Sequence, residues 1–344
     1  MFRKILTLLL ILFLSISLVG CDTKETNTKE IVGQITDGAN RTVNIYADNK
    51  EATVASVYFV ATPFFVALKM TDRVLAVNPR TSFWTDADEG LKQAGTVGKG
   101  NVDLEKLAQY NPTVLIHRSN DPETIEAVEK IGINTLCITV ENADDVINTL
   151  TILGKYFAEE ENASKAINWF NSKLDLIDSV VKQIPDEEKP TAILTGSKVS
   201  RVAGKDMLQS WMIEKAGGKV VVEEYANHNW VDIGLEKLFE YNPETIFLTS
   251  SAARDYDVSD LLSDKTYSSL KAINNNCVFE VPTKLDSWDM PGLSCVLGIM
   301  YMLHEMHPNY FSKEELEDQV DDYYRFMFGR CFDKELNLDW DNFK

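Results

Sequence analysis

The chain contains an internal repeat that limits the folds available to it. Residues 104–112 read LEKLAQYNP and residues 235–243 read LEKLFEYNP, so seven of nine residues are identical at an offset of 131 positions. Each copy runs into an apolar, β-prone stretch, at residues 113–116 and 245–248. The pattern predicts a helix, a tight Asn-Pro turn and a buried strand in each copy. We therefore expect two similar lobes with a ligand cleft between them.

Short β-prone runs alternate with helical or turn-rich spacers around each copy of the repeat. This alternation predicts an α/β fold in which each lobe has a central, mainly parallel sheet flanked by helices. The lobes are expected at residues 31–141 and 185–330, with a C-terminal tail at 331–344. Strands are expected at residues 53–57, 74–77, 114–116 and 135–138 of the first lobe, and at residues 191–194, 220–222, 245–248 and 277–281 of the second.

A helical segment is expected to connect the lobes. Apolar residues recur at helical spacing through residues 142–184 and stop at Pro185, which predicts one long interlobe helix, dented near residues 159–162. A helix across both lobes permits only a small hinge motion, so the cleft should be largely pre-formed. Two amphipathic helices, at residues 291–307 and 313–328, are expected to complete the second lobe.

The N-terminus has the layout of a bacterial export signal. Arg3 and Lys4 precede an apolar run at residues 5–14, and the small-residue sequence LVGC follows at residues 18–21. The run is shorter than the roughly 20 apolar residues of a membrane-spanning helix. We expect residues 1–20 to be a signal peptide and residues 21–30, which are polar, to be a flexible tether.

Charge and cysteine content narrow the possible partners. The net charge of −19 argues against nucleic acid as a partner, and a length of 344 residues suits two domains. The cysteines beyond Cys21 form no C-x-x-C pair and are expected to be small core residues, although one disulfide remains an alternative in an exported protein. These cysteines are Cys137, Cys277, Cys295 and Cys331.

Together, the LVGC box, the duplicated unit, the interlobe helix and the segment ITDGANRTV at residues 35–43 resemble the substrate-binding lipoproteins of ABC importers. The similarity spans residues 31–330 and is to the helix-linked (class III) subgroup, which binds ferric siderophores, haem or vitamin B12. It implies a monomer that carries cargo rather than a cofactor. It also implies lipid attachment at Cys21, location at the outer face of the cytoplasmic membrane, and delivery of cargo to a permease dimer and its ATPase.

The same resemblance implies that Glu105 and Glu236, one in each repeat copy, dock on arginines of the permease. Two equivalent anchors would suit a two-fold symmetric partner. Both glutamates also fit the first turn of a helix, where a negative charge is favoured by the helix dipole. The two explanations are compatible.

Candidate ligand contacts follow the predicted strands, because loops at the carboxyl ends of parallel strands form the ligand crevice in such folds. Guanidinium groups bind carboxylates, catecholates and other oxyanions, and aromatic faces add contact area for a bulky ligand. Trp230 precedes Glu236 by six residues, a spacing similar to that of a ligand-contacting tryptophan in vitamin B12-binding relatives. The candidates are Tyr58, Arg80, Trp84, Lys99, His117, Arg118, Arg201, His228, Trp230, Arg254 and Trp288.

These residues predict a negatively charged or oxygen-rich cargo, a small-molecule metal chelate. A ferric siderophore fits best, and haem, a corrinoid, or a molybdate or tungstate oxyanion remain alternatives. A bare-metal site is not expected, since the sequence holds four histidines and zinc or manganese sites gather several histidines and carboxylates.

Enzymatic activity is not expected. The sequence nearest to a nucleophile elbow, GLSCV at residues 292–296, lacks the second glycine that the tight turn requires. The glycines at residues 95–100 have the wrong spacing for a dinucleotide fingerprint. An exported hydrolase is thus a remote alternative, and a purely structural or adhesive surface lipoprotein is a third class.

Overall fold

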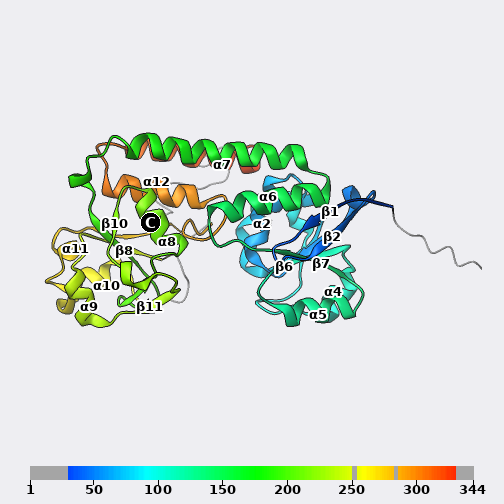
Figure 1. Cartoon of the computed structure of the whole chain (residues 1–344), viewed down its shortest axis with the longest axis horizontal. Coiled ribbons are helices and arrows are strands. Elements are labelled where there is room, and N and C mark those ends of the chain that lie inside the picture. Colours follow the sequence, from blue (N-terminus) through cyan, green and yellow to red (C-terminus); the bar gives the residue numbers. More distant parts are fainter. Residues whose placement is uncertain (1–29, 250–253, 283–285, 331–344) are drawn as a thin grey trace, which may run out of the picture.

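The protein has two lobes arranged side by side along its long axis (Figure 1). The structure is a computed structural model that describes residues 30–249, 254–282 and 286–330. The expected signal peptide, Cys21, most of the tether, Cys331 and the tail lie outside the described residues. Both lobes contain a central sheet covered by helices, as the sequence pattern predicts.

The N-terminal lobe is built on a parallel sheet of five strands in the order β5-β4-β3-β6-β7. Its central strands are mainly apolar, since they are covered on both faces; Val114, Leu115 and Ile116 are fully buried, and the polar residues of β6 stand at its carboxyl end. The strands are β3 (Val54–Ser56), β4 (Val74–Val77), β5 (Gly95–Thr96), β6 (Val114–Arg118) and β7 (Asn134–Ile138). The helices are α2 (Thr62–Ala67), α3 (Ser82–Ala87), α4 (Leu104–Tyr110) and α5 (Pro122–Lys130).

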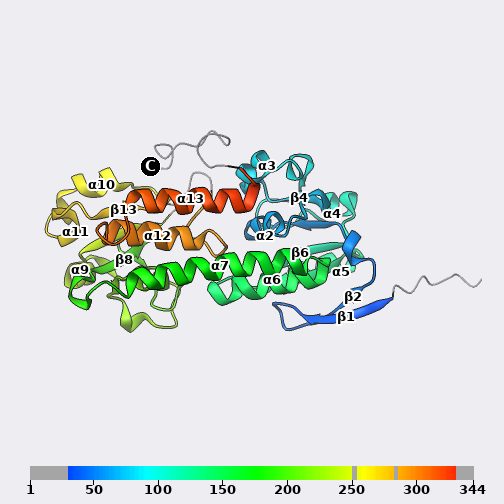
Figure 2. The ribbon, with the colours of Figure 1, turned by 90° about the horizontal axis from the view of Figure 1, so that it is seen from above.

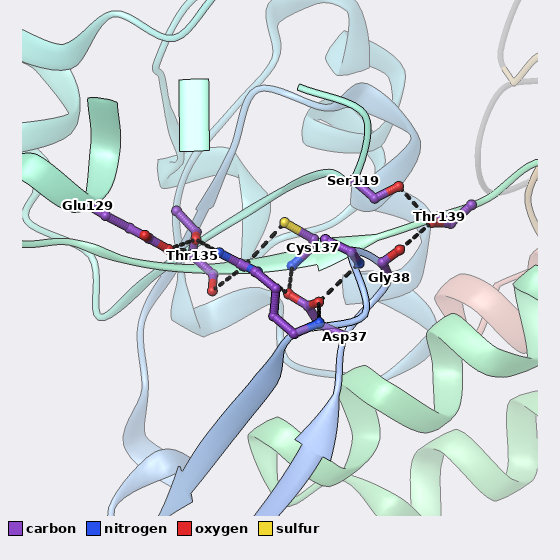
Figure 3. A network of polar contacts seen from close by, with 9 residues as sticks. Asp37, Gly38, Ser119, Glu129, Thr135, Cys137 and Thr139 are labelled. Carbon is purple, nitrogen blue, oxygen red and sulfur yellow. Dashed lines mark hydrogen bonds and ion pairs between the residues drawn. The ribbon is translucent and has the colours of Figure 1, made fainter. Parts of the chain in front are cut away.

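An antiparallel hairpin, which the sequence analysis did not predict, precedes this sheet. It consists of β1 (Ile31–Thr36) and β2 (Thr42–Tyr46). A polar network at the turn fastens the hairpin to β7 (Figure 3). The buried carboxylate of Asp37 accepts hydrogen bonds from the Cys137 backbone N–H at 3.1 Å and from Arg41 Nη2 at 2.8 Å. Arg41 also donates to the Thr135 carbonyl and to Glu129.

The C-terminal lobe combines a parallel core with an antiparallel ribbon. The parallel strands are β8 (Thr191–Thr195), β10 (Lys219–Val220), β12 (Thr245–Leu248) and β13 (Val278–Glu280), and the ribbon strands are β9 (Arg201–Ala203) and β11 (Trp230–Asp232). The ribbon begins where β9 turns back on the carboxyl end of β8. The helices are α8 (Leu208–Lys215), α9 (Gly234–Tyr241), α10 (Val258–Ser263), α11 (Lys271–Asn274), α12 (Cys295–Met306) and α13 (Lys313–Phe328).

Both copies of the repeat form the predicted helix, turn and strand. Helix α4 ends at Asn111 (φ 46°, ψ 54°) and helix α9 ends at Asn242 (φ 40°, ψ 59°), both in the left-handed region. Asparagine tolerates this conformation better than most residues, and the proline that follows in each copy prevents the helix from continuing. The repeated Asn-Pro pair is therefore a helix stop in each lobe.

The expected single interlobe helix is wrong, because the segment forms a helical hairpin. Helix α6 (Ala143–Phe157) ends at Ala158, whose φ of 57° and ψ of 41° are left-handed, and helix α7 (Glu160–Val181) runs back along it. Gly154 allows the close approach, since a Cβ there would lie 2.5 Å from the Ala163 Cβ. Of these two helices it is α7 that crosses both lobes, and its 22 residues span about 33 Å (Figure 2).

Helix α13 also joins the lobes rather than only completing the second. Its C-terminal end packs on the N-terminal lobe, where Lys69 Nζ donates to the carbonyls of Phe326 at 2.9 Å and Met327 at 2.6 Å. The rings of Trp84 and Phe328 lie 5.4 Å apart across the same contact. Helices α7 and α13 lie side by side across the molecule (Figure 2), so two helices resist lobe separation.

Candidate functional site

A cavity of about 850 Å³ lies between the lobes. Its N-terminal wall includes Tyr58 and Glu141, which follow β3 and β7 at their carboxyl ends. Its C-terminal wall includes Arg201, His228 and Trp230. Four of the predicted ligand residues therefore meet at one cavity: Tyr58, Arg201, His228 and Trp230.

The β9–β11 ribbon contributes Arg201 and Trp230 to the C-terminal wall, and the neighbouring segments 206–209 and 227–229 contribute much of the rest. Trp230 pairs with Ala203 in the ribbon register, and Arg201 pairs with Asp232. The Trp230 ring lies against Gly196, where a Cβ would come within 2.8 Å of the ring; glycine is therefore required beside it. Within the described part of the chain no ion pair is formed by Arg201, so its guanidinium is available to an anionic ligand.

The hydrogen bonding of His228 determines which ring nitrogen carries the proton. Nδ1 lies 2.8 Å from the Ala226 carbonyl oxygen, which can only accept, so Nδ1 donates. The neutral ring therefore keeps a lone pair on Nε2, which is free to accept a hydrogen bond or to bind a metal. Among the described residues, no group of three or more His, Cys, Asp or Glu side chains could hold a metal ion by itself.

The N-terminal wall offers a hydroxyl and a carboxylate. Burial, reinforced by Glu141, raises the pKa of Tyr58 to about 12, so its hydroxyl stays protonated and can donate. Desolvation and the neighbouring Asp145 raise the pKa of Glu141 above its usual value. Tyr58 is half-buried whereas Glu141 is exposed, so the hydroxyl is shielded from water more than the carboxylate.

A smaller hollow of about 220 Å³ adjoins the cavity and shares Tyr58 and Phe59 with it. It gathers the other cationic candidates, Arg80, Lys99 and Arg118, around the buried His117. Arg80 and Lys99 follow β4 and β5, and His117 and Arg118 are the last residues of β6; the carboxyl ends of these strands meet at one edge of the parallel sheet. The ends of these strands therefore bring the four side chains together, as expected from their positions in the sequence.

Asp121 holds two of these side chains in place. Its carboxylate is 3.0 Å from His117 Nε2 and 3.2 Å from Arg118 Nη2, and it caps helix α5 through the Thr124 N–H. Burial alone would raise the pKa of Asp121, but these hydrogen bonds lower it to about 2. Burial lowers the pKa of His117 below 6.5, and the contact with Asp121 offsets this only in part.

Three predicted ligand residues line neither the cavity nor the smaller hollow. Trp84 is 4% exposed and packs between Phe83 and Phe328, and Trp288 is fully buried. Arg254 is held by an ion pair with Glu280 at 2.5 Å and by the Thr249 carbonyl. These side chains follow strands as expected, but tertiary packing turns them into the protein.

Other residues of the cavity were not predicted. Glu141 lies in the loop three residues after the end of β7, so the same strand-end rule would have found it. Gln209 lies on α8, and Asn227 lies in the loop before β11. Neither position carries a local signal, because its approach to the cavity depends on how the ribbon folds back.

The two repeat glutamates lie at matching positions on opposite lobes. Glu105 is in the first turn of α4 and Glu236 is in the first turn of α9, and both are exposed. Helices α4 and α9 lie on the side of the molecule opposite α7, one in each lobe (Figure 1). No cation of the described residues forms an ion pair with either carboxylate, so both are available to a partner.

The comparison with known proteins assigns the family. Residues 54–285 match the family model described as periplasmic binding protein. The chain belongs to this family. The binding protein is 22% identical over 256 residues to the molybdate-binding protein MolA of Haemophilus influenzae, a match that covers 67% of this chain and 71% of MolA.

Solved structures share the fold. A periplasmic solute-binding protein from Veillonella parvula superposes with a TM-score of 0.74 at 20% identity, covering 89% of this chain and 95% of that one. Helicobacter pylori CeuE with Ni(II) bound gives 0.72 at 20% identity, covering 89% and 98%. H. influenzae MolA bound to molybdate gives 0.73 at 18% identity, covering 87% and 99%. At these identities the similarity establishes the fold and not the ligand.

The binding protein is thus the class III, helix-linked type of solute-binding component of an ABC importer, and it is not an enzyme. Its partners are the permease and the ATPase of that importer, and it carries a solute rather than a cofactor. None of the described helices is both long and apolar enough to span a membrane.

Proposed function

We propose that the binding protein captures a ferric chelate of the siderophore type in the interlobe cavity and delivers it to its permease. The observation that carries this proposal is the composition of the cavity: the unpaired cation Arg201, the aromatic Trp230 and the imidazole of His228 line one space of about 850 Å³. A guanidinium suits carboxylate or catecholate oxygens, and an indole face suits the flat organic part of a chelate.

Cavity size favours a chelate over a free oxyanion. A tetrahedral oxyanion has five heavy atoms and would fill at most roughly 150 Å³, even if each atom took the ~30 Å³ share of a separate water molecule. The interlobe cavity of about 850 Å³ falls within the ~300–1,000 Å³ range of small-molecule sites. A free oxyanion would therefore leave most of the cavity to water, whereas an iron chelate would fill it.

Membrane attachment and docking form the rest of the proposal. Lipid on Cys21 would hold the protein at the outer face of the cytoplasmic membrane, since several acyl chains at about 0.8 kcal/mol per buried CH₂ give stable anchoring. Glu105 and Glu236 would then dock on the permease, one from each lobe. Metabolic labelling with a fatty acid tests the anchor: label should appear in the wild type and disappear in Cys21→Ala.

Calorimetric titration of the purified protein tests the cargo. The panel comprises ferric siderophores with catecholate, hydroxamate and carboxylate donors, together with haem, cobalamin, molybdate and free Fe³⁺. We expect saturable binding of a ferric siderophore at micromolar or tighter affinity. Tight binding of haem or cobalamin with no response to the siderophores would replace the proposed cargo.

A molybdate or tungstate oxyanion is the second candidate cargo. Its support is the similarity to MolA, whose solved structure is described as bound to molybdate, together with the small cationic hollow beside the main cavity. The same titration separates the two candidates, because an oxyanion carrier should bind molybdate tightly and should not respond to ferric siderophores.

A further inference from the structure

The cationic hollow of the N-terminal lobe has properties that the main cavity lacks. Arg80, Lys99 and Arg118 are exposed around it, in a protein whose net charge is −19. Among the described residues, Arg80 and Lys99 form no ion pair, and Asp121 is the carboxylate that contacts Arg118. Positive charge is therefore in excess at this position.

His117 provides a second, independent observation. Its side chain is 2% exposed and lines the hollow. Nε2 contacts Asp121 at 3.0 Å, whereas the buried Nδ1 has no hydrogen-bond partner in the protein. Leaving a buried polar atom unpaired costs roughly 1–3 kcal/mol, so this nitrogen is suited to a ligand.

We propose that the hollow is an oxyanion subsite, in which Arg80, Lys99 and Arg118 bind a carboxylate or a tetrahedral oxyanion and His117 takes up a proton when the site fills. The volume of about 220 Å³ can hold such a group, which fills at most roughly 150 Å³. The oxyanion is either a free ion or one acidic group of a larger chelate that also occupies the main cavity. The proposal rests on the proposed function in placing the hollow beside the cargo.

The proton uptake follows from the groups around the imidazole. The titratable and charged groups on the elements beside His117 are Asp121, Arg118, Arg80, Lys99, Tyr58 and Cys137. Burial raises the pKa of both Tyr58 and Cys137 to about 12, and the pKa of Asp121 is about 2. Between pH about 5 and about 8, His117 is therefore the group in this set that changes its charge.

The direction of the effect is determined by charge. In the free protein burial lowers the pKa of His117, so the ring is neutral near pH 7. An anion in the hollow favours the protonated ring, and Nδ1–H can then donate to it. Affinity therefore rises as the pH falls through the pKa of the bound state, and it levels off below the pKa of the free state.

The test uses the purified full chain, kept in solution by a mild detergent, and two probes. Sulfate and molybdate represent the free ion, and the tightest-binding ferric siderophore represents the chelate. Calorimetry in buffers of different ionisation enthalpy counts the protons taken up, at pH about 6 and about 8. Imidazole NMR with labelled histidine follows the pKa of His117, which is assigned by its loss in His117→Gln.

We expect proton uptake and an affinity about 10-fold higher at the lower pH. His117→Gln should abolish the proton uptake, and Arg118→Gln should weaken binding about 10-fold or more, as for a hydrogen bond between charged groups. Lys165→Gln, which alters an exposed cation of α7, is the matched control. It should change neither the proton uptake nor the affinity. Melting curves confirm that each variant is folded.

The outcomes separate this proposal from the proposed function. Proton uptake on binding of sulfate or molybdate identifies a site for the free ion. Proton uptake on binding of the siderophore alone identifies a site for an acidic group of the chelate. If neither probe raises the pKa of His117 while the siderophore still binds tightly, the subsite is disproved and the proposed function stands. If oxyanions bind with proton uptake and no siderophore binds, the subsite stands and the proposed cargo is wrong.

Discussion

The two lobes share a repeated helix and strand but present different walls to the cavity. The N-terminal wall consists of loops at the ends of parallel strands, and its cations gather in a hollow of their own. The C-terminal wall includes an antiparallel ribbon, β9–β11, which extends from the carboxyl end of β8 and carries Arg201 and Trp230, together with the segments beside it. Duplication has thus kept the outer helices α4 and α9 alike, while the surfaces facing the ligand differ.

The repeat copies themselves differ at one end. Both helices stop at a left-handed asparagine, Asn111 or Asn242. At the start, however, Asp103 caps α4 by accepting from the Lys106 N–H at 3.1 Å, whereas α9 begins after Ile233 without a side-chain cap. The shared stop and the different starts allow the similarity of the two lobes to be tested residue by residue.

The largest effect is expected from the paired glutamates. Replacing Glu105 and Glu236 together with alanine should abolish cargo uptake by cells while leaving cargo affinity unchanged, because both residues are exposed and neither lines the cavity. If the two lobes dock equivalently, each single variant should lose a similar part of the uptake. Uptake is measured with radiolabelled iron chelate.

Gln109→Ala and Glu240→Ala are the controls for this experiment, since both are exposed positions on the same two helices. They should transport normally. Normal uptake by the double glutamate variant would remove the docking assignment, and a strong defect in only one single variant would show that the lobes dock unequally.

The next largest effect concerns the ribbon wall. Arg201→Ala and Trp230→Ala should each weaken cargo binding about 10- to 100-fold, as expected for losing a charged hydrogen bond or an aromatic contact worth about 1.5–3 kcal/mol. Lys198→Ala, at an exposed side chain on the same lobe, should have little effect. Calorimetry measures the affinity, and unchanged affinity in both variants would place the ligand elsewhere.

Replacing the asparagines that end α4 and α9 should change the free energy of unfolding by about 1–2 kcal/mol. Asn111→Ala and Asn242→Ala force alanine into the left-handed region, which costs roughly that amount. Asn111→Gly should be near neutral. Asn242→Gly should cost about 1 kcal/mol, because the Asn242 side chain also accepts from the Lys271 N–H at 2.8 Å. Denaturant unfolding measures these differences, and equal glycine effects would contradict the assigned role of Asn242.

The smallest effect is expected from the cap present in one copy only. Asp103→Ala should destabilise the protein by about 1 kcal/mol through loss of the N-cap. Asp103→Asn keeps the capping oxygen, so its free energy of unfolding should stay within a few tenths of a kcal/mol of the wild type. The free energy of unfolding is again the measurement. Equal losses in both variants would mean that the charge of Asp103, rather than its capping oxygen, stabilises α4.

Much of the fold could be predicted because its signals are local. The apolar run at residues 74–77 and the amphipathic pattern at residues 313–328 match β4 and α13, and the repeat located both lobes. A dent was expected near residues 159–162, but the reversal of the chain at Ala158 was not, because an alanine in the left-handed region leaves no mark in the sequence. The ribbon was missed because its three-residue strands are too short to show alternation.

The candidate site was predictable as a set of strand-end loops but not as a list of side chains. Tyr58, Arg201, His228 and Trp230 line the cavity. Trp84 follows a strand in the same way, yet it packs on Phe328, which is distant in sequence. Whether an aromatic residue faces the ligand or the core is decided by such long-range contacts, which the spacing of residues does not encode.

The most direct test of the interlobe cavity as the cargo site is quenching of tryptophan fluorescence by a ferric siderophore. Among the described tryptophans, Trp230 is the one that lines the cavity. We predict saturable quenching in the wild type and loss of most of it in Trp230→Phe, with binding by that variant still detectable by calorimetry. Quenching that persists undiminished in a Trp230→Phe protein that binds the siderophore would contradict the account, because the chelate would then bind away from this cavity.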